Sequence, residues 1–225
     1  GSASSNSNGS ITSSVSANQD AGFSIVSYTG TGSGSATIGH GLGVKPKVVL
    51  IKSRSLAKNW IYWQDTNGDG SGETRLALNL TNADFANYPV TFNTNTITLP
   101  SLSDDAWSTS SATYIAYCFA EKQGYSKFGS YTGNGNADGT FVYLGFKPAW
   151  VLCKLSSGSG YGWTLFDNKR AGYNQDNYTL QPDGNAGENT GGGNGRIDIL
   201  SNGFKQRSTD AGVNGSGNTY IYMAF

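Results

Sequence analysis

Short segments in which apolar and polar side chains alternate dominate the chain. Successive side chains of a β-strand point to opposite faces, and this period of two runs through residues 23–28, 59–63 and 113–121. Residues 48–52 are apolar at most positions, which predicts a central strand covered on both faces. The 3.6-residue period of an amphipathic helix is not sustained anywhere in the sequence. The pattern therefore predicts an all-β fold built from short strands.

Three stretches of the first half recur in the second. The segment that begins at Tyr28 returns from Tyr131, residues 42–52 return as 144–154, and the segment that begins at Thr113 returns from Thr219. Such internal similarity is the signature of a repeated structural unit. We therefore expect two tandem, pseudo-twofold-related β-sandwich or jelly-roll-like repeats, at residues 21–122 and 123–225. Residues 1–20 are rich in Ser and Asn, and this composition predicts a flexible linker that follows a preceding domain.

The alternation also predicts which side chains form the core. Trp60 and Trp163 occupy matching positions, and we expect both to be buried. Near the end of the first repeat we expect Ile115, Tyr117 and Phe119 to face the core. Tyr114 would then lie on the opposite face of the same strand.

Composition excludes two classes of partner. Fifteen basic residues balance fifteen acidic ones without any basic run, so the electrostatic footprint of a nucleic-acid-binding protein is absent. No apolar run approaches the roughly 20 residues that span a bilayer, and we expect no membrane insertion. Cys118 and Cys153 both lie in apolar runs, which predicts two buried free thiols rather than a disulfide between the repeats.

One polar loop has the spacing of a calcium site. Asp65, Asn67 and Asp69 alternate and Gly70 follows, as in the opening of an EF-hand loop, where side-chain oxygens at positions one, three and five bind the ion. The bidentate glutamate of position twelve is missing, so Glu73 or a distant residue would complete the coordination shell. Polar Asp/Gly turns are also common without metal. Calcium is therefore the one cofactor that the sequence suggests.

Aromatic residues near strand ends and in polar loops provide candidate ligand contacts. Sugar rings stack on the faces of Trp and Tyr, while amides and carboxylates accept or donate hydrogen bonds to the hydroxyls. The alternative is that these rings fill loops and strand edges or pack between subunits. The candidate ligand-binding residues are Trp63, Trp107, Tyr161, Tyr173 and Tyr178.

Nothing in the sequence favours catalysis. His40 is the single histidine and lies in a Gly-rich turn, where a structural role is the simpler interpretation. A glycoside hydrolase would need two carboxyl groups about 5–9 Å apart. The acidic residues that could supply such a pair are Asp84, Asp104, Asp105, Asp138, Asp167, Asp183 and Glu188. We expect no catalytic residue and no enzymatic activity.

Residues 22–30, 38–42, 114–121 and 125–135, taken together, resemble a repeated module of unknown function. That module occurs in tail and other virion proteins of marine bacteriophages, often beside concanavalin-like lectin domains. The resemblance covers residues 11 to 225 and brings no catalytic or ligand-binding residue with it. It implies a place on the virion, outside the host cell, in a tail fibre or adhesin.

We therefore expect a non-catalytic module that binds a host-surface receptor, either glycan or protein, and that forms a homotrimer. Two other functions stay open at this point. One is a structural spacer or assembly module without a ligand, and the other is a polysaccharide depolymerase.

Overall fold

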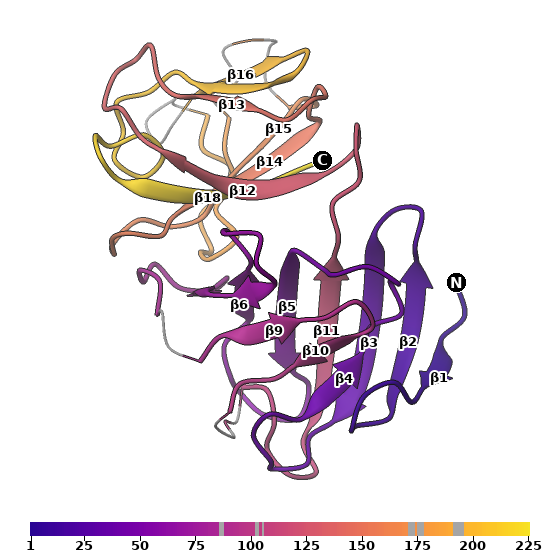
Figure 1. Cartoon of the computed structure of the whole chain (residues 1–225). Helices are drawn as coiled ribbons and strands as arrows, with labels where there is room; N and C mark the ends of the chain where they lie inside the picture. Colours follow the sequence, from indigo (N-terminus) through magenta and orange to yellow (C-terminus); the bar gives the residue numbers. More distant parts are fainter. Residues whose placement is uncertain (86–87, 102–103, 105, 171–173, 175–177, 191–195) are drawn as a thin grey trace. The chain divides into compact units, whose positions relative to one another are not determined.

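The computed structural model describes the whole chain except residues 86–87, 102–103, 105, 171–173, 175–177 and 191–195. The described residues form eighteen strands, β1 to β18, and no helix. The predicted all-β fold is thus confirmed, and no helix in the described part could cross a membrane. The chain divides into two compact units (Figure 1). The first contains residues 1–77 and 85–122, and the second contains residues 78–84 and 123–225.

The first unit consists of two antiparallel sheets that face one another across a core. The seven-stranded sheet has the order β1 (Ser4–Asn6), β2 (Ser13–Asn18), β3 (Phe23–Thr29), β11 (Thr113–Phe119), β5 (Val48–Ser53), β6 (Ile61–Gln64) and β8 (Thr74–Ala77). The four-stranded sheet has the order β4 (Thr37–Gly39), β10 (Thr96–Thr98), β9 (Val90–Phe92) and β7 (Ser71–Gly72). Figure 1 shows β4, β10 and β9 lying across the face of β3, β11 and β5. Side chains from both sheets meet in one hydrophobic cluster.

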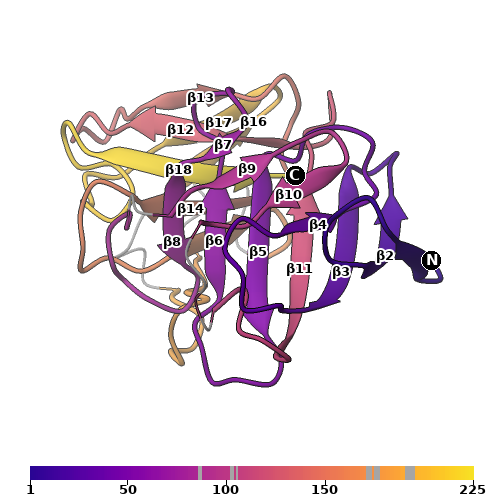
Figure 2. The same cartoon turned by 60° about the horizontal axis from the view of Figure 1, so that its bottom comes forward.

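The second unit also consists of two antiparallel sheets, with fewer strands. Its larger sheet has the order β12 (Lys127–Thr132), β18 (Thr219–Ala224), β14 (Trp150–Leu155) and β15 (Thr164–Asp167). Its smaller sheet has the order β13 (Phe141–Tyr143), β17 (Gly203–Gln206) and β16 (Ile197–Leu200). Figure 2 shows the smaller sheet on one side of β18 and β14, and a second hydrophobic cluster lies between the two sheets.

The strand order of the two units agrees with the tandem repeat. β3, β11, β5 and β6 are neighbours in the first unit, and β12, β18, β14 and β15, which the sequence similarity pairs with them, stand in the same order in the second. The expected boundary between residues 122 and 123 is also where the second unit begins, apart from residues 78–84. The repeat itself stays a prediction that this shared order supports.

The prediction of a flexible linker at residues 1–20 is wrong. β1 and β2 form an antiparallel hairpin, and β2 pairs with β3, so these residues extend the large sheet of the first unit. Ile11 and Val15 are buried in the hydrophobic cluster. Backbone hydrogen bonds to a neighbouring strand are open to any residue except proline, and they order a segment whose side chains are mostly Ser and Asn.

The core face of β11 is also opposite to the one expected. Tyr114, Ala116 and Cys118 are fully buried in the cluster, whereas Tyr117 and Phe119 lie on the other face and pack against Phe23 at 6.5 and 5.0 Å between ring centroids. Both faces of this strand carry large apolar side chains. Period-two alternation therefore identifies the strand but does not tell which face is buried.

The prediction that Trp60 is buried is also wrong. Trp163 is buried as expected, but Trp60 is partly exposed and stacks on Tyr117 with 6.1 Å between ring centroids. The buried tryptophan at this end of the first unit is Trp63, which packs edge-on against Trp107. Trp60 precedes β6 and lies on the face opposite Trp63.

Both cysteines are buried and free, as the sequence predicts. Burial raises the pKa of each thiol to about 12. A thiol with that pKa carries almost no thiolate near neutral pH, so neither cysteine is a reactive nucleophile.

His40 ties two loops of the first unit together. Its ring is fully buried. Nδ1 accepts a hydrogen bond from Leu42 N at 3.2 Å, and Nε2 lies 3.1 Å from the carbonyl oxygen of Asn93. Nε2 must therefore be the protonated nitrogen that donates to this carbonyl, and the imidazole is neutral. His40 N also donates to the carbonyl of Asn95 at 3.2 Å.

Replacement of the buried tryptophans should separate core from surface. We expect Trp63→Ala and Trp163→Ala to lower the free energy of unfolding by about 3–5 kcal/mol each, the range for truncating a large buried side chain. Trp60→Ala is the matched control and should cost clearly less. Urea denaturation of the three variants measures the difference, and equal losses at Trp60 and Trp63 would contradict the assignment of the core face.

The buried imidazole should make stability depend on pH. Burial lowers the pKa of His40 below its ordinary value of 6.5, so the unfolded chain binds more protons than the folded chain just below pH 6.5. The free energy of unfolding should therefore fall as the pH drops below 6.5, by at most about 1.4 kcal/mol per pH unit from this group. Urea titrations at pH 7.5, 6.5 and 5.5 test this, with His40→Asn as the variant that lacks the slope. A wild-type curve as flat as that of His40→Asn would rule the assignment out.

Candidate functional site

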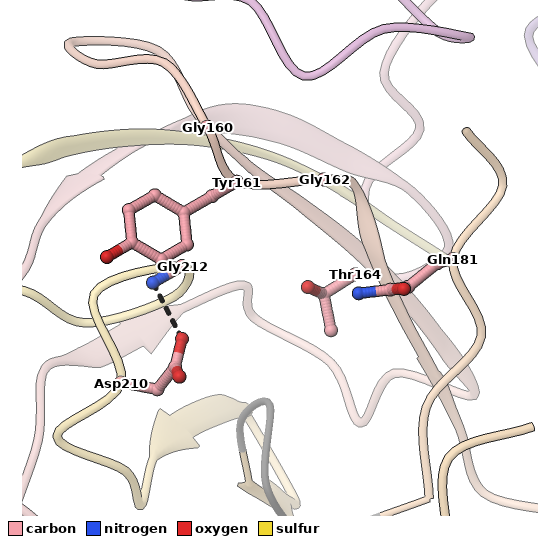
Figure 3. A pocket seen from close by; sticks show the side chains of 7 residues that line it. All are labelled: Gly160, Tyr161, Gly162, Thr164, Gln181, Asp210 and Gly212. Atoms are coloured by element: carbon pink, nitrogen blue, oxygen red, sulfur yellow. Dashed lines mark hydrogen bonds between the residues drawn. The ribbon is translucent and has the colours of Figure 1, made fainter. Parts of the chain in front are cut away.

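The second unit contains a small, partly open cavity of about 220 Å³. Figure 3 shows the Tyr161 ring on one side, the Asp210 carboxylate below it, and the Thr164 hydroxyl and Gln181 amide opposite. Three glycines complete the lining, and they let the backbone approach the cavity closely. The lining residues are Gly160, Tyr161, Gly162, Thr164, Gln181, Asp210 and Gly212.

Two tyrosine hydroxyls hold the wall of this cavity that carries Asp210. The Tyr131 hydroxyl donates to the carbonyl of Val213 at 2.7 Å, and the Tyr220 hydroxyl donates to the carbonyl of Ala211 at 2.6 Å. Tyr131 and Tyr220 are themselves stacked, with 5.0 Å between ring centroids. The loop after β17 is thus fixed to the hydrophobic core.

Within that loop, Asp210 folds back on its own backbone. Its Oδ1 accepts a hydrogen bond from Gly212 N at 2.7 Å, shown as the dashed line in Figure 3. This is the Asx-type turn that Asp favours in loops. The turn directs the carboxylate toward the cavity and leaves Oδ2 without a hydrogen bond in the described part of the chain.

The corresponding loop of the first unit has hydrogen bonds of the same kind. Ala106 N donates to Asp104 Oδ1 at 2.8 Å, and the carbonyl of Trp107 accepts from Tyr28 at 2.8 Å. Trp107 then fills the core of that unit against Trp63.

Smaller residues in the second unit leave room for Tyr161. Gly212 and Val213 stand where the first unit has Ala106 and Trp107. A Cβ atom at Gly212 would lie 3.1 Å from Cδ1 of Tyr161 and 2.8 Å from Oδ1 of Asp210. The absence of a side chain at Gly212 is therefore what allows the ring and the carboxylate to line one cavity.

Residues 78–84 support the loop that leads to Tyr161. Asp84 N donates to the carbonyl of Ser156 at 2.9 Å, and Gly160 N donates to the carbonyl of Thr81 at 3.1 Å. These two hydrogen bonds join residues 78–84 to the loop and so fix the backbone immediately before Tyr161.

Lys154 adds a buried cation to this support. The side chain is fully buried, and its Nζ donates to the carbonyls of Asn82 at 3.0 Å and Leu155 at 2.7 Å. Burial lowers the pKa of Lys154 to about 8, against the opposing effect of the nearby Asp183 carboxylate. The ammonium thus ties residues 78–84 to the strand that precedes the Tyr161 loop.

The cavity offers one aromatic face and four unused polar groups. The Tyr161 side chain is 40% exposed. Its hydroxyl, the Thr164 hydroxyl, the Gln181 amide and Oδ2 of Asp210 make no hydrogen bond within the described residues. Drug-sized ligand pockets span about 300–1,000 Å³, so this cavity has room for a single small polar ring or its equivalent.

The sequence analysis identified one of these lining residues and missed the others. Tyr161 was expected from its place in a polar loop. Thr164, Gln181 and Asp210 come from a strand and two loops that are far apart in the sequence, so no local pattern links them. The sequence Asp210-Ala211-Gly212 could have indicated an Asx turn, and that turn sets the geometry of the Asp210 carboxylate.

The prediction that Trp63 and Trp107 bind a ligand is wrong. Trp63 and Trp107 are fully buried, and Trp63 Nε1 already donates to the carbonyl of Tyr88 at 3.2 Å. Neither ring can meet a ligand. Tyr178 is partly buried and does not line the cavity, and Tyr173 lies outside the described residues.

The acidic residues considered for hydrolysis have structural contacts. Oδ1 of Asp183 accepts from Trp163 N at 2.8 Å, and Asp138 pairs with Lys205 and Arg207. Asp167 and Glu188 both pair with Arg170, and Asp104 accepts from Ala106 N. Asp105 lies outside the described residues. Asp104, Asp138, Asp167, Asp183 and Glu188 therefore each have a hydrogen bond or ion pair within the chain.

The predicted calcium loop does bring three carboxylates together. Asp65, Asp69 and Glu73 each place a carboxylate oxygen within 4.8 Å of the other two. Ligands on opposite sides of a calcium ion are about 4.6–5.2 Å apart, twice the usual Ca–O distance, so one ion could touch all three. Asn67, the fourth predicted ligand, is exposed.

Other groups already use most of these oxygens. Oδ2 of Asp65 accepts from Lys47 Nζ at 3.2 Å and Oδ1 accepts from Gly68 N at 2.5 Å. Oε1 of Glu73 accepts from Thr66 N at 2.8 Å, whereas Oε2 is buried without a hydrogen bond. Lys47 thus provides the positive charge that the loop needs, and calcium would have to displace it from Asp65.

Calcium binding to this loop stays a prediction that thermal unfolding can test. A ligand present at 100 times its Kd stabilises the folded state by about 2.7 kcal/mol, so 10 mM Ca²⁺ should raise the melting temperature by several degrees if Kd is about 0.1 mM. Asp69→Ala should abolish the rise, and Lys47→Gln should enlarge it because the competing ammonium is gone. Identical curves in Ca²⁺ and in chelator, for wild type and Lys47→Gln alike, would show that Lys47 is the loop's only cation.

Comparison with known proteins assigns no activity to this cavity. No curated protein and no solved structure matches the chain. A family model described as "Domain of unknown function (DUF7483)" matches residues 1–225. Because that match spans the whole length, the chain belongs to the DUF7483 family.

Proposed function

We propose that the chain is a non-enzymatic module that binds carbohydrate on a cell surface through the cavity of the second unit. The observation that carries this proposal is the placement of the partly exposed Tyr161 ring beside the unpartnered Oδ2 of Asp210 and the Gln181 amide. A pyranose has an apolar face of C–H groups and a rim of hydroxyls. An aromatic ring with donors and acceptors around it suits both parts.

Each lining group has a distinct part in this binding. The apolar face of one sugar packs on Tyr161, Oδ2 of Asp210 accepts from a hydroxyl, and Gln181 donates to one neighbouring hydroxyl and accepts from another. Thr164 is a buried residue, and its hydroxyl makes no hydrogen bond within the described part of the chain. Among the described residues that line the cavity, Asp210 is the one that carries a charge, so a neutral sugar is favoured over one that carries a carboxylate.

The biological setting of the proposal comes from the resemblance to virion proteins of marine bacteriophages. On that basis the module belongs to a tail fibre or adhesin, on the outside of the particle, and its receptor is a glycan of the host surface. The proposal includes a homotrimer, since several weak sites acting together raise the apparent affinity by roughly 10²–10⁴. A structural spacer without a ligand is the alternative function.

Variants of the cavity test the binding site. The mass of the protein in solution is measured first. The protein is then applied to an array of neutral and acidic glycans, and the neutral glycan that binds best is titrated by calorimetry. Tyr161→Ala and Asp210→Asn should each weaken binding about tenfold, because a factor of ten corresponds to 1.4 kcal/mol and each change removes one contact of that size. Tyr143→Ala is the matched control, since Tyr143 is a tyrosine of the same unit that is 59% exposed and lies outside the cavity.

Other outcomes point to other functions. Equal binding by wild type and Tyr161→Ala would place the site elsewhere. Failure of the wild type to bind any glycan or intact host cells would favour the structural spacer. Release of reducing sugar would favour a depolymerase, and a monomeric mass at high concentration would count against the trimer.

A further inference from the structure

The first unit also has a concave surface, and its composition differs from that of the cavity in the second unit. It is an open groove of about 480 Å³. Among the described residues, those that line it are all polar or charged: Asn8, Lys45, Asn93, Thr94, Asn95 and Thr96. Three side-chain amides, two hydroxyls and one ammonium therefore face one space.

The hairpin between β9 and β10 forms most of the groove and is held firmly. Asn93 N donates to the carbonyl of Thr96 at 2.9 Å, which closes the turn. The Asn93 amide nitrogen lies 3.4 and 3.3 Å from the hydroxyls of Thr96 and Thr98. From beneath, the buried His40 bonds to the carbonyls of Asn93 and Asn95. A rigid turn of this kind loses little conformational freedom when it binds a ligand.

The side chains at the rim of the groove are unused. Asn8, Thr94 and Asn95 make no side-chain hydrogen bond in the part of the chain that the structure describes. An amide side chain offers a donor and an acceptor side by side. Neighbouring hydroxyls on a sugar offer the complementary pair, so several amides around an open groove match a hydroxyl-rich chain.

Lys45 supplies a charge that no described carboxylate pairs with. Its side chain is exposed and lies against Gly70. A Cβ atom at Gly70 would lie 2.9 Å from Nζ of Lys45. Among the described residues Lys45 has no hydrogen bond or ion pair. The adjacent acidic loop has its own cation, because Asp65 pairs with Lys47 at 3.2 Å. The ammonium of Lys45 is therefore available to a ligand in the groove.

We propose that this groove is a second carbohydrate-binding site, which binds an acidic oligosaccharide such as a chain of uronic acids. Hydroxyls of the oligosaccharide bond to Asn8, Thr94 and Asn95, and a carboxylate pairs with Lys45. The absence of apolar lining residues disfavours a lipid or an apolar peptide. A single ammonium is far less than the several cations by which proteins neutralise a nucleic-acid backbone.

The test uses the whole chain with the Tyr161→Ala change, so that binding by the cavity of the second unit is weakened about tenfold. The probe is a tetramer of galacturonic acid, and the control ligand is the same tetramer with its carboxylates reduced to alcohols. Calorimetry should give tighter binding of the acidic form by up to about fivefold, the worth of one exposed ion pair. Lys45→Gln should remove that difference. Asn95→Ala should weaken both ligands by about fivefold, because it removes a hydrogen bond that both make.

Arg54→Gln is the matched charge control. Arg54 is exposed and comes directly after the last residue of β5, whereas Lys45 precedes the first residue of that strand. Replacement of Arg54 therefore changes the net charge of the protein without changing a residue that lines the groove. It should leave binding of both tetramers unchanged, and melting curves confirm that every variant is folded. Equal affinity for the two tetramers, or equal loss in Lys45→Gln and Arg54→Gln, would overturn the proposal. Lys45 and Asn95 do not line the cavity of the second unit, so the effects of Lys45→Gln and Asn95→Ala are independent of whether that cavity binds sugar.

Discussion

Buried tyrosine hydroxyls fix the loops on which both units depend. A phenolic hydroxyl inside a core is costly unless it is hydrogen-bonded. Tyr28 and Tyr131 meet this requirement by donating to the carbonyls of Trp107 and Val213. Burial raises the pKa of both tyrosines well above 10.0, so each stays a hydrogen-bond donor. The loop that closes each sandwich is thereby tied to the centre of the sandwich.

The same constraint explains why equivalent loops have different surroundings. With the backbone fixed, the side chains of the loop decide what fills the space around it. In the first unit Trp107 completes the core and carries the Arg75 guanidinium over its ring, 5.0 Å from the centroid. In the second unit Val213 is buried in the core at the corresponding position, and Gly212 lines the cavity together with Tyr161. The two loops thus differ in whether a large aromatic side chain or a glycine and a valine stand at corresponding positions.

The sequence predicted those features that local pattern controls. Strands such as Val48–Ser53, the all-β fold and the buried cysteines follow from hydrophobic pattern, and the carboxylate cluster at residues 65–73 follows from spacing. The buried face of β11 could not be predicted, because Tyr114 and Tyr117 are equally suited to a core. The ordering of residues 1–20 could not be predicted either, since an added edge strand is held mainly by backbone hydrogen bonds. The cavity depends on Tyr161, Gln181 and Asp210, which tertiary structure alone brings together.

The assignment of residues 78–84 to the second unit has a consequence for how the chain is made and how it can be cut. These residues lie between β8 and β9 of the first unit, yet their hydrogen-bond partners are Lys154 and residues 156–160. During synthesis the segment leaves the ribosome some 70 residues before those partners do. Until they emerge, residues 78–84 cannot form these hydrogen bonds. A fragment that begins at residue 123 would likewise lack the carbonyl that Lys154 needs, leaving a buried ammonium short of one partner. A fragment of residues 123–225 would therefore contain the described strands β12 to β18 but not the segment that completes the second unit.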